Sequence, residues 1–111
     1  MAFDTELAER VRVVLAGSAP APPVEKKMFG GLTFMVSGNM CCAVMGEDLL
    51  VRVGAAEVGR ALAEPGTRQF DMGRGPSAGF LLVTPAGVAA DEALANWVRK
   101  ALVFVATLPA K

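Results

Sequence analysis

Residues 26–54 read KKMFGGLTFMVSGNMCCAVMGEDLLVRVG, one long apolar segment that is divided by two short polar breaks. Both breaks, residues 37–39 and 46–48, contain residues that tolerate the positive φ angles of hairpin turns. The runs around the breaks alternate with a period of two residues, which predicts strands with side chains such as Leu32 and Phe34 on one face. We therefore predict a three-stranded meander onto which the rest of the chain packs.

Periodicity and capping signals outside the meander predict three helices and two further strands. The first helix is capped by Asp4 or Thr5 and stops at Gly17, the second is short and covers residues 55–63, and the last is capped by Asp91 and ends before Pro109. The two strands cover residues 68–72 and 80–84 and are joined by a Gly- and Pro-rich hairpin loop. The prediction is an α+β fold of order α-β-β-β-α-β-β-α. Its sheet is mainly antiparallel and covered by helices, in a single domain over residues 1–111.

The balance of charges argues against two classes of partner. The chain has 111 residues, and its 11 basic side chains are matched by 11 acidic ones. Because no net positive field attracts polyanions, we expect no direct sequence-specific binding of nucleic acid and no binding to an anionic membrane surface.

One segment has nearly the length of a bilayer span. Residues 28–46 carry no charge, but glycines, Ser37 and Asn39 interrupt them, and their alternation is that of strands. The N-terminus carries Asp4 and Glu6 where a signal peptide has its basic region. We therefore expect a cytoplasmic protein without a membrane segment.

The two cysteines, Cys41 and Cys42, are adjacent within a predicted strand. Neighbouring strand residues point to opposite faces, so these thiols are expected to be buried apart and poorly placed to bond each other. The chain has no histidine and no CxxC spacing. We therefore expect no metal site and no cofactor.

Three segments carry a resemblance to a known family. The run KKMFGGLTFMVSGNM, then LLVRVG, then a Gly-Arg-Gly-Pro turn that leads into GFLLV, is similar in order and spacing to the TfoX N-terminal domain family over nearly the whole chain. The resemblance implies a secretion-chaperone-like arrangement of one helix, three strands, a helix, two strands and a helix. Members named for competence are transcriptional co-regulators of DNA-uptake genes with a second, C-terminal helical domain. We expect this chain to be a stand-alone N-terminal-type domain.

The residues themselves predict no catalytic set. The chain lacks His and Tyr, and its acids are scattered among turns and strand ends, so we expect a protein that is not an enzyme. Two hypotheses remain. The first is a small protein-interaction module that acts as a regulator or transcriptional co-regulator related to competence. The second is a small-ligand or anion-binding domain that uses residues 26–31.

Seven residues are candidates for binding a ligand or a partner. Glycine permits close approach to the main chain, and basic side chains attract anions. The candidates are Lys26, Lys27, Phe29, Gly30, Gly31, Arg52 and Arg74. The alternative is that the charges are solvated surface and that the glycines serve a bulge or a close packing contact.

The last predicted helix suggests that the chain associates with a second copy of itself. At 100° per residue its apolar side chains fill an arc of about 160°, wider than one sheet needs to cover. The arc holds Leu94, Trp97, Val98, Ala101, Leu102, Phe104, Val105 and Leu108, and Val103 is the only large aliphatic residue on the opposite side. We therefore predict a homodimer, with cover of the excess by the first helix of the same chain as the alternative.

Overall fold

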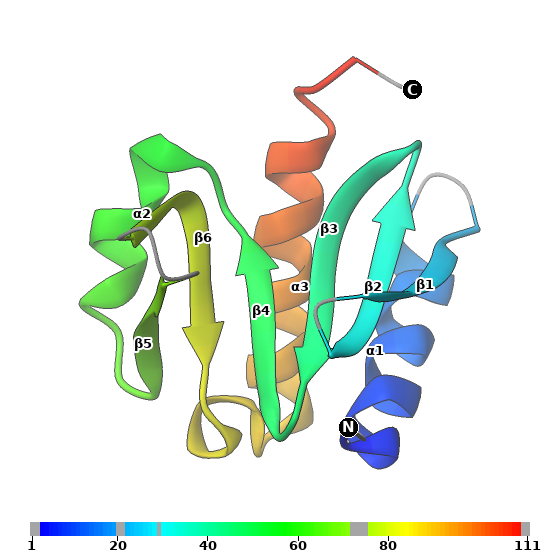
Figure 1. The fold of residues 1–111 in the computed structure, drawn as a ribbon, viewed down its shortest axis with the longest axis horizontal. Coiled ribbons are helices and arrows are strands. Elements are labelled where there is room, and N and C mark those ends of the chain that lie inside the picture. Colours follow the sequence, from blue (N-terminus) through cyan, green and yellow to red (C-terminus); the bar gives the residue numbers. More distant parts are fainter. Residues whose placement is uncertain (1–2, 20–21, 29, 72–75, 110–111) are drawn as a thin grey trace.

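The computed structural model describes residues 3–19, 22–28, 30–71 and 76–109. The elements are α1 (Thr5–Ser18), β1 (Val24–Met28), β2 (Gly31–Val36), β3 (Asn39–Met45), β4 (Asp48–Arg52), α2 (Ala55–Leu62), β5 (Thr67–Asp71), β6 (Pro76–Val83), the 3-10 helix η1 (Pro85–Val88) and α3 (Asp91–Val105). The strands form one antiparallel sheet of order β1-β2-β3-β4-β6-β5. Figure 1 shows α1 and α3 side by side behind this sheet, which confirms the predicted α+β fold. Within the described ranges, every helix is too short or too polar to span a bilayer.

The first run of the predicted meander forms two strands, β1 and β2, where one strand was predicted. Gly30 has a φ of 74° and reverses the chain, so that β1 pairs back on β2 with Met28 opposite Gly31 and Val24 opposite Met35. The periodic pattern does not reveal this turn, because two glycines between apolar runs also fit a continuous strand. The element order therefore has one strand more than predicted before α2.

Other element boundaries also differ from the prediction, two of them with a consequence for the loop or the cap that was predicted there. The strand β6 begins at Pro76, so part of the predicted hairpin loop is paired strand. The cap residue of α3 is Ala90, and Asp91 is the first helical residue. At the start of α1, the Asp4 carboxylate accepts a hydrogen bond of 3.0 Å from the Leu7 N–H, so the predicted cap is confirmed there.

Most of the core lies between the sheet and the helices. Residues of α1, α2 and α3 pack on one sheet face around the fully buried Phe34, as the alternation of β2 predicts. The largest fully buried side chains of this layer are Leu15, Leu49, Leu81, Leu94, Val11, Val36, Val44, Val51, Val83 and Val98. A smaller cluster on the other face buries Ala43, Leu50 and Phe70.

Both thiols are free and buried, as predicted, but the prediction that they lie on opposite faces is wrong because β3 contains a β-bulge. Phe34 pairs with Cys42 and Met35 pairs with Met40, so Cys41 is an extra residue that the pairing skips. A bulge interrupts the two-residue alternation, and both thiols lie fully buried in the helix-covered core. A hydrogen bond with the Cys41 thiol, together with burial, raises the pKa of the Cys42 thiol well above its usual range.

Ion pairs fasten α1 to the rest of the molecule. The Arg10 guanidinium lies 3.0 Å from the Asp91 carboxylate and donates to the Val88 carbonyl at 2.8 Å. The Arg12 guanidinium donates to the Glu25 carboxylate of β1 at 2.6 Å. This hydrogen bond holds the pKa of the Glu25 carboxyl below its ordinary value of 4.5.

The Arg12–Glu25 pair predicts a dependence of stability on pH. A carboxyl whose pKa is lower in the folded state stabilises the fold above its unfolded pKa, and this contribution is lost as pH falls through the folded pKa. We expect Glu25→Gln to lower the free energy of unfolding at neutral pH and to matter less as pH falls below about 4.5. Urea melts from about pH 3 to about pH 7 test this, with Glu47→Gln at an exposed turn as the control. A difference in unfolding free energy between Glu25→Gln and the parent that stays constant down to about pH 3 contradicts this prediction.

Gly31 is required by the close approach of two strands. A Cβ at this position would lie 2.2 Å from the Val44 carbonyl oxygen, whereas a Cβ at Gly59 meets nothing within 4 Å. We expect Gly31→Ala to lower the free energy of unfolding by roughly 1 to 3 kcal/mol or more. Gly59→Ala, inside α2, should leave it unchanged or raise it by up to about 1 kcal/mol. Chemical melts compare the two variants. Equal unfolding midpoints for the two variants would show that the strands move apart at Val44 and accept the added methyl group.

Candidate functional site

The structure separates the residues of the predicted site. Lys26 and Lys27 are exposed on the edge strand β1, on opposite faces, because Lys26 pairs with Thr33 and Lys27 with the core residue Leu32. Gly30 forms the turn after β1, and the missing side chain of Gly31 is explained by the Val44 carbonyl. Phe29 and Arg74 lie outside the described residues.

Arg52 lies far from the two lysines, since β2 and β3 stand between its strand and β1. Its guanidinium carbon is 5.5 Å from the ring centroids of both Phe80 and Phe104. One of its nitrogens donates to the Met40 carbonyl at 3.4 Å. Arg52 therefore joins β4 to β3, β6 and α3, and the structure does not bring it together with Lys26 and Lys27.

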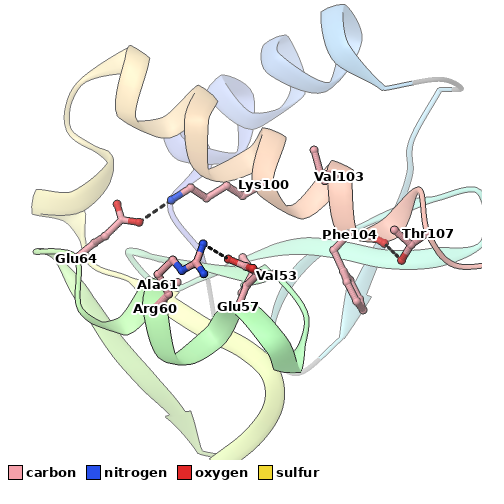
Figure 2. A pocket seen from close by; sticks show the side chains of 9 residues that line it. All are labelled: Val53, Glu57, Arg60, Ala61, Glu64, Lys100, Val103, Phe104 and Thr107. Atoms are coloured by element: carbon pink, nitrogen blue, oxygen red, sulfur yellow. Dashed lines mark hydrogen bonds and ion pairs between the residues drawn. The ribbon is translucent and has the colours of Figure 1, made fainter.

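A groove lies between α2 and α3 (Figure 2). Its volume is about 350 Å³. The floor is apolar and comes from the end of β4 and from both helices, and the rim is charged or polar. Floor residues are Val53, Ala61 and Phe104, the apolar Val103 lies at the edge, and the polar or charged rim residues are Glu57, Arg60, Glu64, Lys100 and Thr107.

Two glycines position the walls of the groove. Gly54, with a φ of 92°, begins α2, and a Cβ there would lie 2.5 Å from the Phe104 ring. The Gly79 carbonyl accepts hydrogen bonds from the Val53 and Gly54 N–H groups at 2.8 and 3.1 Å. The segments Arg52-Val53-Gly54 and Gly79-Phe80, two of those that carry the family resemblance, thus meet directly below the groove.

Several polar groups of the rim already have a partner within the molecule. Lys100 Nζ lies 2.6 Å from the Glu64 carboxylate and 4.5 Å from the centre of the Trp97 ring. The Thr107 hydroxyl donates to the Phe104 carbonyl at 2.6 Å. Figure 2 shows the ion pairs and this hydrogen bond among the side chains that line the groove. Contact with an apolar side chain is therefore the interaction that the groove leaves open.

A second hollow of about 410 Å³ continues the groove along the outer face of α3. It shares Glu64, Lys100 and Val103 with the first. Val103 is 70% exposed, the highest exposure among the large apolar side chains of the described residues. The two hollows together follow α3, which is 15 residues or about 22 Å long.

None of the predicted site residues that the structure describes lines this groove, and the sequence did not predict which residues would form it. One signal was present, because Val103 is the only large aliphatic residue on the polar side of the last helix. The contributions of Val53 and Ala61 depend on how α2 packs beside α3, which periodicity within each helix does not specify. Among the described residues, no three His, Cys, Asp or Glu side chains gather as metal ligands.

Comparison with protein families identifies the chain. The family model of the TfoX N-terminal domain matches residues 18–105. The chain belongs to the TfoX N-terminal domain family. This family is associated with competence regulation. The part that matches the TfoX N-terminal domain runs from the end of α1 to the end of α3 and includes all groove residues except Thr107. Searches of the curated proteins and of the solved structures give no match.

The packing of Arg52 yields a test within this TfoX N-terminal domain. Arg52→Lys keeps the charge but removes the planar guanidinium from its place beside the rings of Phe80 and Phe104, so we expect a loss of about 1 kcal/mol in unfolding free energy. Arg68→Lys, at an exposed position of β5, is the matched control and should leave the melt unchanged. A melt of Arg52→Lys that coincides with the parent would show that a simple positive charge suffices there.

Proposed function

We propose that this chain is a non-enzymatic protein-interaction module that acts as a regulator and binds an apolar segment of a protein partner in the groove between α2 and α3. The observation that carries the proposal is the apolar surface that the exposed Val103 and the half-buried Phe104 present in a groove whose rim carries the Glu64–Lys100 ion pair. The association of its family with competence regulation supports a regulatory role, including that of a transcriptional co-regulator.

The shape of the groove favours a helix as the bound segment. The hollows follow α3 over most of its length, and an amphipathic helix is the element that lays an apolar stripe along such a surface. A compact polar ligand would need free donors or acceptors, whereas Glu64 and Lys100 are held by each other. The floor therefore suits aliphatic or aromatic side chains.

The groups that line the groove also support a role without catalysis. Glu57 lies 3.6 Å from Arg60 and Glu64 lies 2.6 Å from Lys100, so each carboxylate of the rim has a cationic neighbour. Catalysis by a general base needs a carboxylate or an imidazole directed at the substrate. The two thiols are buried in the core and do not line the groove.

Capture of partners from the cytoplasm of the native host tests the proposal. We expect the tagged parent to retain a defined protein and Val103→Asp to lose it, because a carboxylate on the groove's apolar margin would have to give up its hydration when an apolar segment covers it. Val13→Asp is the matched control, since Val13 is also an exposed valine, on α1 and outside the groove, at 66% against 70% for Val103. Mass spectrometry identifies the captured species. A co-purifying metabolite and no protein would favour the small-ligand hypothesis and refute the proposed one.

A further inference from the structure

We propose that the partner of this groove is a second copy of the chain, whose α3 lies antiparallel to the first α3 across a two-fold axis. This inference rests on the proposed function, because it names the segment that the groove binds. In a two-fold pair the same patch serves both copies, so each α3 fills the groove of the other.

Val103 supplies the apolar contact between the two copies. It lies on the edge shared by both hollows, and it is 70% exposed although its neighbours on the floor are apolar. A second α3 placed over the groove inserts its own Val103 onto the floor of Ala61 and Phe104. Each copy then covers the most exposed large apolar side chain of the other.

The charges of the two walls are complementary. The outer face of α3 carries Arg99 and Lys100 beside Asn96 and Thr107, with no acid over residues 93–105. The opposite wall carries Glu57 and Glu64 with a single Arg60. Because Lys100 already pairs with Glu64 of its own copy, the charges left for a second copy are Arg99 on α3 and Glu57, whose pair with Arg60 is loose. A pairing of copies that brings Arg99 to Glu57 is favoured over one that places two basic faces together.

The position of α2 indicates the register, that is, which residues of the two α3 helices lie opposite each other. Gly54 at the start of α2 contacts Phe104, so Glu57 lies toward the Phe104 end of the groove. If Lys100 of one helix lies opposite Val103 of the other, an antiparallel alignment puts Arg99 opposite Phe104. Arg99 then reaches Glu57 of the second copy.

The two groups that this register joins are available for a new contact. No ion pair of Arg99 occurs among the described residues. The existing pair of Glu57 with Arg60 is loose at 3.6 Å, with side chains 54% and 83% exposed. Glu57 can therefore turn to Arg99 of the second copy at little cost, because an exposed pair of this kind contributes little to stability.

Light scattering on a size-exclusion column measures the association directly. At tens of micromolar we expect a dimer mass for the parent and for Val13→Asp, and a monomer mass for Val103→Asp with an unchanged thermal melt at low concentration. A parent that stays monomeric overturns the inference. A dimer that survives Val103→Asp overturns it as well, since the copies then associate through another surface.

Charge reversal tests the register. Arg99→Glu and Glu57→Arg should each weaken the dimer by about tenfold or more, and the combined variant should regain most of the loss. Analytical ultracentrifugation gives the dissociation constants. Single variants that weaken the dimer without recovery in the combined variant show that Arg99 and Glu57 do not meet, and that outcome overturns the proposed alignment.

The outcomes also separate this inference from the proposed function. A monomeric parent that loses a captured protein upon Val103→Asp refutes the second copy and keeps the interaction module, whose partner is then a different protein. A monomeric parent whose captured proteins do not change upon Val103→Asp refutes both. A dimer that Val103→Asp abolishes supports both.

Discussion

The hydrogen bonds from the Val53 and Gly54 N–H groups to the Gly79 carbonyl determine where the sheet ends and where α2 begins. They join the end of β4 to β6 at a point where Gly54 and Gly79 both have positive φ angles and no side chains to separate the strands. The chain can therefore turn into α2 directly below Phe104. The groove exists because this junction holds α2 beside α3 while leaving Val53 at the bottom.

The elements could be predicted wherever local pattern and tertiary structure agree. Phe34 faces the core because β2 is a regular strand, and Asp4 caps α1 through a contact three residues away. Prediction failed where one residue changes the geometry of a neighbour. Gly30 turns an apparent single strand into two, and the bulge at Cys41 reverses the side of a thiol, although neither position alters the apolar pattern.

The candidate site was predicted less well for a related reason. Lys26, Lys27 and Arg52 were selected by residue type and by motif, but their separation depends on strand order, in which β2 and β3 lie between them. The groove depends on contacts between residues far apart in the sequence, such as Gly54 and Phe104. Only Val103, an aliphatic side chain on a polar helix face, marks the groove in the sequence itself.

The balance of energies suggests how the groove would act between two copies. Full burial of one valine is worth roughly 1.5 to 3 kcal/mol, while association costs an estimated 4 kcal/mol or more. Two Val103 side chains therefore need the further burial of the half-exposed Phe104 before a dimer is stable. Exposed pairs between Arg99 and Glu57 add at most about 1 kcal/mol each, and salt weakens them. In the proposed dimer, apolar contact would thus set how tightly the copies associate, and the charged rim would set the alignment in which they do so.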